Sequence, residues 1–456
     1  SFLSTILLFA SHTYRPDAGL YHIPYVKILN EEKIIFGLAN LHFRFGHVSI
    51  IQYLSAINLN FFTNFIGISI PSAVIASVVI LNFIAKFRIH IIKKNYNFHF
   101  YYLMGILIYI FIKMNRYSEY GNDAPAHFLA FYFLSEFLLL NKNNLKVNKI
   151  MDLSLIGVFI VLNKLTLFLI LIIPLYLVLK TKFFEVFKNV KFYFILIFGL
   201  MWILKNIIVS GCLLYPVNIT CNKNLFWSDI VTVEKISLEN EAFSKNWPNF
   251  KDRNKVTKLE YINNFNWFKT WSKKFLDEQK EKSFAFSFIL IFFYLIIVTK
   301  SKKNKKNLEK NILFLFILIL STFFWLIKIP DFRYLYSIII SLITYFFALT
   351  LSNRTFNKDQ RKFFSSIILL FFLAFIFKNF IRIFNTSAYY DYPNPRIYSH
   401  NDDNNKLNYK LKIINNKKIY HQQNGYCMYT KTLCTPYEIN INIKYKKSYL
   451  FFFKKT

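Results

Sequence analysis

Long apolar runs separated by short polar ones dominate the sequence. Runs such as FYFILIFGLMWIL and SFAFSFILIFFYLIIV approach the roughly 20 residues needed to cross a bilayer core. Backbone polar groups inside lipid must bond within their own segment, so such runs predict helices. We therefore expect an all-α polytopic membrane protein with about eleven transmembrane helices. After a truncated first span at the start, the expected spans are residues 63–85, 97–112, 125–140, 151–162, 165–179, 192–209, 283–299, 312–327, 334–350 and 363–380.

The positive charge lies between these runs. The formal net charge is +33, but Lys and Arg gather in short clusters, which is typical of cytoplasmic loops and not of a nucleic-acid surface. We therefore expect no nucleic-acid partner. With the expected spans, the basic loops all fall on one side of the membrane: residues 86–95, 141–149, 180–191, 300–310 and 352–362. The other, extracytoplasmic side then holds the outer loops 11–62, 113–124, 210–282 and 328–333 and the tail.

Residues 151–180 test this arrangement. A single long helix there would place its two flanking basic loops on opposite sides. A hairpin that turns at Asn163 and Lys164 keeps the loops together, and we predict that hairpin. Lys164 then lies near the outer side, either as a turn residue whose amine reaches the water or as a cation that lines an outward cavity.

The chain divides into a transmembrane domain, residues 1–384, and a small extracytoplasmic C-terminal segment, residues 385–456. On an oxidising face, Cys427 with Cys434 and Cys212 with Cys221 are candidate disulfide pairs. The sequence has no Cys-x-x-Cys spacing, so we expect no metal ligands among these cysteines. It also lacks a P-loop and the motifs G-x-G-x-x-G and H-E-x-x-H.

The first outer loop opens with RPDAGLYHIPY, which is rich in ionisable groups. Asp17 and Tyr21 are four residues apart and would share a helix face. Asp17 also suits a helix N-cap. Further along, residues 34–54 mix apolar and basic side chains and could lie along the membrane surface.

The second outer loop repeats this chemistry. Asp123 and His127 are four residues apart at the start of a span, and Asp123 also suits an N-cap. An acid followed by a histidine occurs at the earlier junction too, as Asp17 and His22. Capping alone does not predict this recurrence, so we interpret both pairs as candidate catalytic groups.

Two later outer loops add basic and aromatic residues. The short loop 328–333 carries Arg333, whose planar fork suits a phosphate or a carboxylate, although an interfacial anchor is the alternative. The loop 210–282 is rich in Trp, which either anchors the chain at the membrane interface or stacks on sugar rings.

In their order along the chain, PDAGLYHIPYVKIL, GLANLHFRFG, KNIIVSGCLLYP, IPDFRY and CMYTKTLCTP resemble the GT-C superfamily of membrane glycosyltransferases. The resemblance covers most of the chain. It implies an essential acid in the first outer loop, matched by Asp17, and a second acid, matched by Asp123. It also implies an Arg-Tyr pair near the lipid phosphate, matched by Arg333 and Tyr334. The chain has a lone Asp17 where better-known members have a paired Asp-Glu motif, which leaves a divalent metal cofactor open.

The resemblance implies a glycosyltransferase in a bacterial inner membrane, active on its extracytoplasmic face. Its partners would be membrane lipid, a polyprenyl-phosphate sugar donor and a glycan or lipid acceptor. Asp17 would act as the base or orient the acceptor, Arg333 and Lys164 would hold the phosphate, and Asp123 with His22 or His127 would assist. The remaining candidates for substrate binding are Arg15, Tyr21, Arg44 and Tyr334. The alternatives are an O-antigen-type polysaccharide polymerase and a transporter or lipid flippase.

Overall fold

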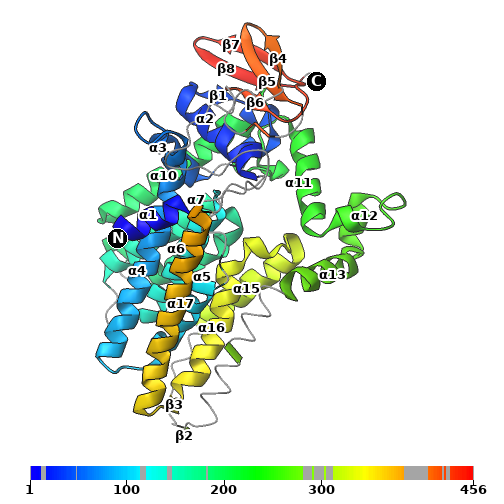
Figure 1. Ribbon diagram of the computed structural model, residues 1–456. Helices are drawn as coiled ribbons and strands as arrows, with labels where there is room; N and C mark the ends of the chain where they lie inside the picture. The colour runs from blue at the N-terminus through cyan, green and yellow to red at the C-terminus, as the bar shows by residue number, and fades with distance from the viewer. Residues whose placement is uncertain are drawn as a thin grey trace.

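The structure is a computed structural model and is mostly helical (Figure 1). It describes residues 2–11, 17–47, 49–112, 114, 120–140, 146–180, 183–280, 290–291, 302–303, 312–384, 409–423, 426–427 and 432–454.

Most apolar helices follow the hydrophobic runs, but α4 (Ile70–Ile92) lies later than the expected span 63–85 and includes part of the expected basic loop 86–95. They are α4 (Ile70–Ile92), α5 (Phe98–Ile112), α6 (Asp123–Leu139), α7 (Val147–Asn163), α8 (Ile172–Leu179), α10 (Val190–Ser210), α15 (Ile312–Lys328), α16 (Tyr336–Ser352) and α17 (Lys358–Phe384). Three described helices are long and apolar enough to cross a membrane: Gly67–Ile92, Val190–Ser210 and Lys358–Phe384. Most of the expected span 283–299 lies outside the described residues.

Shorter elements connect and cover these helices. They are α1 (Phe2–Ala10), η1 (Ala18–His22), α2 (Ile23–Glu31), η2 (Leu38–Asn40), η3 (Phe43–Gly46), α3 (Ile50–Asn58), η4 (Asn64–Ser69), η7 (Leu165–Leu171), α9 (Phe183–Phe187), η8 (Asn218–Thr220), α11 (Ile230–Ser244), η9 (Trp247–Asn249), α12 (Lys258–Asn263), α13 (Trp267–Lys280) and η10 (Phe332–Tyr334).

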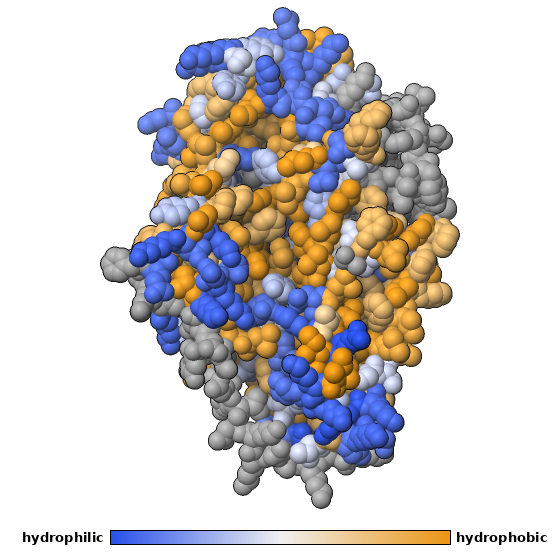
Figure 2. Space-filling model, turned by 90° about the vertical axis from the view of Figure 1, so that its left-hand side faces the viewer, coloured by the Kyte–Doolittle hydropathy of each residue, from blue (hydrophilic) through white to orange (hydrophobic). Residues whose placement is uncertain are grey.

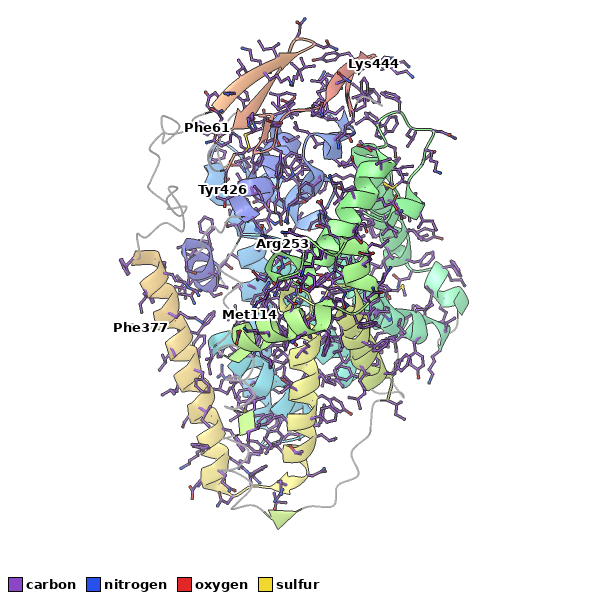
Figure 3. The ribbon with its side chains drawn as sticks, turned by 90° about the vertical axis from the view of Figure 1, so that its right-hand side faces the viewer. Phe61, Met114, Arg253, Phe377, Tyr426 and Lys444 are labelled. Carbon is purple, nitrogen blue, oxygen red and sulfur yellow. A yellow bond between two sulfur atoms is a disulfide. The ribbon has the colours of Figure 1, made fainter. Side chains whose placement is uncertain are left out.

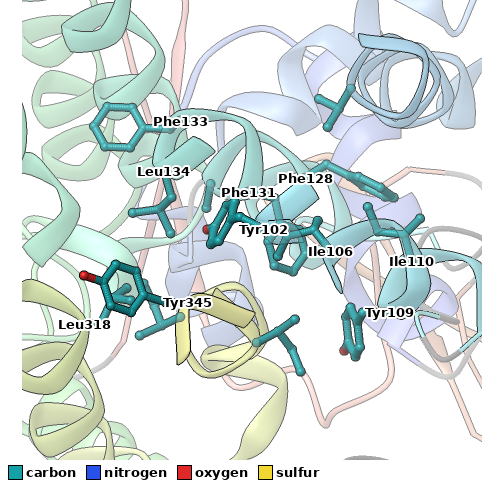
Figure 4. Packing of buried hydrophobic residues seen from close by; sticks show 14 of the residues in the cluster. Tyr102, Ile106, Tyr109, Ile110, Phe128, Phe131, Phe133, Leu134, Leu318 and Tyr345 are labelled. Atoms are coloured by element: carbon teal, nitrogen blue, oxygen red, sulfur yellow. The ribbon is translucent and has the colours of Figure 1, made fainter. Parts of the chain in front are cut away.

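Helix α5 lies at the centre of the main hydrophobic core, packed against α4, α6, α16 and α17. Figure 4 shows how Tyr102 and Ile106 of α5 lie among Phe131 of α6 and Tyr345 of α16. At Gly105 the two helices approach each other closely, because an added Cβ there would lie 2.5 Å from a Thr344 methyl carbon. A small residue is therefore needed where α5 crosses α16, as is common between membrane helices.

The chain turns where the sequence predicts it. Helix α7 ends at Asn163, Lys164 adopts an extended conformation, and η7 begins at Leu165. At the opposite end of the bundle, strands β2 (Lys302–Lys303) and β3 (Arg354–Thr355) pair with each other (Figure 1, bottom). Two of the predicted basic loops therefore lie at the same end of the helices.

Much of the lateral surface is apolar. Figure 2 shows hydrophobic residues across the middle of one face, with hydrophilic residues toward its two ends. Helix α10 is largely uncovered, with Leu200 65% and Met201 64% exposed. Phe377 of α17 also points away from the bundle (Figure 3) and is 67% exposed. Continuous apolar faces of this kind are typical of surfaces that contact lipid.

The C-terminal tail corrects the expectation of an all-α chain. It forms β4 (Tyr409–Ile414), β5 (Lys417–Gln422), β6 (Cys434–Thr435), β7 (Asn442–Lys446) and β8 (Tyr449–Phe453). Strands β4 and β5 are antiparallel, and β6 joins β5 in parallel. Strand β8 pairs with β7 and also with β1 (Ile35–Phe36), which comes from the other end of the sequence.

The tail therefore shares a core with the first part of the chain. Leu450 and Phe452 of β8 are buried in one cluster with Ile35 and Leu38. The tail residue Lys417 donates to both carboxylate oxygens of Glu32, at 2.9 and 2.7 Å. The described part of the tail, from Tyr409 onward, thus packs onto the first outer segment of the chain. Both cysteine pairs named from the sequence, Cys212 with Cys221 and Cys427 with Cys434, are joined as disulfides.

Candidate functional site

Asp17 and Arg333 meet although 316 residues separate them. Asp17 immediately precedes η1, and Arg333 lies in η10, between α15 and α16. Arg333 Nη1 donates to Asp17 Oδ2 at 3.3 Å, and its Nε lies 3.0 Å from Asp331 Oδ2. Arg333 Nη2 donates to the Tyr334 hydroxyl at 2.9 Å. One guanidinium therefore joins two carboxylates and a phenol.

Asp123 and Lys164 form the second ion pair of the site. Asp123 is the first residue of α6, and Lys164 follows the last residue of α7. The Lys164 amine donates to Asp123 Oδ1 and lies 4.5 Å from the centre of the Tyr334 ring. The two ion pairs thus share Tyr334. We call Asp17, Asp123, Lys164, Asp331, Arg333 and Tyr334 the ion-pair cluster.

Side chains from α6, α13, α15 and α16 contact the Arg333 loop. His127 Nε2 donates to the Arg333 carbonyl oxygen at 2.9 Å, and His127 Nδ1 lies 2.9 Å from Ser337 Oγ. A carbonyl only accepts, so the proton of a neutral His127 sits on Nε2. Trp325 donates to the Asp331 carbonyl at 2.7 Å, and Trp271 of α13 donates to the Pro330 carbonyl.

These contacts answer two questions left by the sequence. His127 is fully buried and contacts the backbone of Arg333, so it positions the cluster. Trp267 and Trp271 are buried, at 2% and 8% exposure, so their rings serve the packing of α13 and are not open platforms for sugar rings.

The electrostatics of the cluster favour charged Arg333. Burial alone would lower the pKa of Arg333, but Tyr334 and the carboxylates of Asp331, Asp123 and Asp17 raise that pKa well above its usual value. The guanidinium consequently keeps its charge at any physiological pH. It also balances carboxylates that would otherwise repel one another.

A second group of residues borders the cluster. The Arg44 guanidinium carbon lies 5.0 Å from the centre of the Tyr21 ring. Burial raises the pKa of the Tyr21 hydroxyl, and the charge of Asp17 adds to this effect. His22 Nδ1 lies 3.1 Å from the side-chain amide of Gln52, and burial lowers the pKa of His22 to about 4. Tyr21 and His22 are therefore neutral at pH 7.

Some local expectations need correction. Neither Asp17 nor Asp123 caps a helix through its side chain; both carboxylates form ion pairs instead. Lys164 does not reach toward water, since its side chain is 4% exposed. The described residues of the stretch 34–54, for which the sequence predicts a position along the membrane surface, form β1, η2, η3 and part of α3. Arg15 lies outside the described residues.

Sequence reasoning missed several supporting residues. Gln52, Asn163 and Ser337 hold backbone or side-chain atoms around the site. Asn163 Oδ1, for example, accepts the Ile51 backbone N–H at 2.9 Å. Such polar residues carry no motif, and only their position beside a helix end could have drawn attention to them.

Chemically, the site places a partly exposed carboxylate close to two cationic side chains and a phenol. The Asp17 side chain is 37% exposed, whereas those of Asp123 and Lys164 are 18% and 4% exposed. Asp17 is therefore the carboxylate best placed to meet a substrate. Across the described residues, no group of three or more His, Cys, Asp and Glu side chains is arranged to hold a metal ion. Beside Tyr334 lies a shallow apolar depression, lined by Thr166, Phe324, Trp325, Ile329 and Leu335.

The family model described as Domain of unknown function (DUF8201) matches residues 1–340, which include the whole ion-pair cluster. No curated protein and no solved structure matches the chain.

Proposed function

We propose that this chain, which belongs to the family described as Domain of unknown function (DUF8201), is a membrane glycosyltransferase. It would move a sugar from a polyprenyl-phosphate-linked donor to the hydroxyl group of a glycan or lipid acceptor. The observation that carries the proposal is the meeting of Asp17, Asp123 and Arg333 in one cluster. Their residue types, and the Arg-Tyr pair among them, are those that the resemblance to GT-C enzymes implies.

The reaction assigned to the cluster is a displacement at the anomeric carbon. The Asp17 carboxylate accepts the proton of the acceptor hydroxyl, and the hydroxyl oxygen forms a bond to the anomeric carbon. The bond from that carbon to the phosphate oxygen breaks, and its electron pair leaves with the lipid phosphate. Cations near the phosphate stabilise the charge that develops there.

The contacts and exposure of the three carboxylates favour Asp17 as the base. Asp331 accepts the Arg333 backbone N–H at 3.1 Å, and Asp123 pairs with the buried Lys164. Asp17 is the most exposed of these carboxylates, at 37%, so an acceptor hydroxyl can reach it.

The proposed setting is a bacterial inner membrane, crossed about eleven times, with the cluster on the extracytoplasmic side. Two features support this orientation. Basic loops meet at the opposite end of the helices, which favours the cytoplasm for that end. The disulfide-bonded cysteines belong to the segment after α10 and to the tail, and disulfides persist in oxidising compartments.

The test is sugar transfer in membranes that contain the full chain and a labelled polyprenyl-phosphate sugar. Asp17→Asn should lower the transfer rate about 100-fold or more, because the base is lost while the shape is kept. The matched control is Asp252→Asn, an exposed acid between α11 and α12, which should stay within about twofold of the unsubstituted chain. Unchanged transfer by Asp17→Asn at normal abundance would overturn the proposal.

A further inference from the structure

The cations of the site differ in how far they are already engaged. Arg333 uses Nη1 on Asp17 and Nη2 on the Tyr334 hydroxyl, and its Nε lies beside Asp331. Lys164 is paired with Asp123. A phosphate could bind either of these cations only by displacing a carboxylate or by sharing the cation with it, and both reduce the gain in free energy.

Arg44 is different. Within the part of the chain that the structure describes, Arg44 forms no ion pair, and its Nε is buried without a hydrogen-bond partner. Its guanidinium lies over the ring of Tyr21 and, at 5.5 Å, over that of Phe43. A buried donor without a partner is energetically unfavourable, and an anionic ligand would supply the missing acceptor.

His42 presents a second free donor beside Arg44. Its Nδ1 accepts the Arg44 backbone N–H at 3.0 Å. Burial lowers the pKa of His42 to about 3, so the ring is neutral at pH 7. A neutral imidazole that accepts at Nδ1 carries its proton on Nε2. That Nε2 is buried and has no partner among the described residues.

The hydroxyl group of Tyr215 is the third hydrogen-bond donor. Its ring packs on η3, since an added Cβ at Gly46 would lie 2.5 Å from Tyr215 Cε1. Burial raises the pKa of Tyr215, and the charge of Arg44 acts against that rise. The hydroxyl therefore keeps its proton, and it too is buried without a partner.

We infer that Arg44, His42 and Tyr215 form a binding site for a phosphate group, and that Arg333 orients Asp17 and does not bind the phosphate. A phosphate offers several acceptor oxygens and a negative charge, which match one guanidinium and two neutral donors. The inference rests on the proposed function, in which this phosphate belongs to the polyprenyl donor. Tyr21 links the two parts, because the charges of both Arg44 and Asp17 act on its hydroxyl. The sugar would then lie between the phosphate at Arg44 and the base at Asp17.

The experiment measures binding to the full chain in lipid nanodiscs. The probes are a polyprenyl monophosphate, the polyprenol of the same length, and inorganic phosphate as competitor. The unsubstituted chain should bind the monophosphate at least about tenfold more tightly than the polyprenol.

Arg44→Gln should remove most of that preference. The matched control Arg253→Gln, which removes an exposed arginine that contacts the Pro248 carbonyl, should keep it. Competition by inorganic phosphate in the unsubstituted chain, lost in Arg44→Gln, would assign the site to phosphate itself. Failure of inorganic phosphate to compete would assign it to the lipid-linked form.

A second variant protects the test against misfolding. Tyr215→Phe removes one oxygen and keeps the ring on Gly46, so it should fold and should weaken monophosphate binding about threefold to tenfold. The inference would be overturned, and the proposed function kept, by one pattern of results. In it, Arg44→Gln and Tyr215→Phe keep the full preference for the monophosphate over the polyprenol, and Arg333→Gln loses that preference. No preference for the monophosphate in the unsubstituted chain would instead count against the proposed function.

Discussion

The two ends of the helical bundle use charge in different ways. At the end that holds the candidate site, ion pairs link the start of η1, the start of α6, the end of α7 and the loop before α16. These segments are far apart in the sequence, and Tyr334 contacts both basic groups. At the other end, Lys86 of α4 pairs with Glu136 of α6, and Lys191 of α10 pairs with Asp152 of α7. Each of those pairs joins only two helices.

This difference distinguishes the ion-pair cluster from ion pairs that only hold two helices together. The exposed pair of Lys191 and Asp152 loses little when one partner becomes neutral, because water already screens both charges. A network that gathers several like charges in a buried place is costly to assemble. Its presence at one end of the bundle therefore calls for a chemical role.

The largest expected effect on stability compares Asp123 with Asp152. Asp123→Asn takes the carboxylate away from Lys164, whose side chain is 4% exposed, and should lower the free energy of unfolding by about 3–5 kcal/mol. Asp152 is 54% exposed, and Asp152→Asn should cost under about 1 kcal/mol. Unfolding in detergent, followed by intrinsic Trp fluorescence, measures both variants. Equal losses would remove the distinction between the two ends.

The pH dependence of stability gives the next effect. Burial lowers the pKa of His22 to about 4 in the folded chain, against 6.5 for an ordinary histidine. Below pH 6.5 the unfolded chain therefore binds a proton that the folded chain does not. The stability that His22 contributes is complete above pH 6.5 and is lost progressively as the pH falls toward 4, by about 3 kcal/mol in total.

Melting temperatures of the full chain between pH 7.5 and 4.5 check this window. The control is His22→Gln, which cannot titrate and should show a shallower fall in melting temperature over the same range. Parallel curves for the two chains would contradict a neutral, buried His22.

The smallest effect compares two buried histidines. His127 contacts the Arg333 carbonyl, whereas His99 of α5 lies 3.0 Å from Ser135 Oγ near the other end. His127→Gln should lower the rate of sugar transfer about tenfold by shifting Arg333, with a smaller change in the KM for the donor. His99→Gln should lower transfer less than about twofold at equal abundance. A matching loss in both variants would mean that His127 serves stability alone.

The sequence anticipates those parts of this molecule that depend on local pattern. Apolar runs locate the helices because each helix satisfies its own backbone, and the polar Asn163 and Lys164 mark the turn after α7. Charged residues at the helix ends identify Asp17, Asp123, Lys164 and Arg333, which the structure brings together.

What the sequence leaves out depends on contacts between distant segments. The pairing of β8 with β1 joins Leu450 to Ile35, and no local period signals a partner so far along the chain. An acid at the start of a helix can cap the helix or form an ion pair. The sequence alone therefore does not determine the roles of Asp17 and Asp123. The role of His127 is not predictable from the sequence either, because it depends on a contact with the distant Arg333 carbonyl.

The coupling between Asp17 and Arg333 in sugar transfer tests the account most directly. Transfer of a labelled sugar from its polyprenyl-phosphate carrier would be measured for Asp17→Asn, Arg333→Gln and the double variant, at matched abundance. If the two residues act as one unit, each single variant should lose about 100-fold or more, and the double variant should be no slower than the slower single variant by more than about threefold. Single variants that transfer sugar at the unsubstituted rate would contradict the claim that this cluster is the catalytic centre.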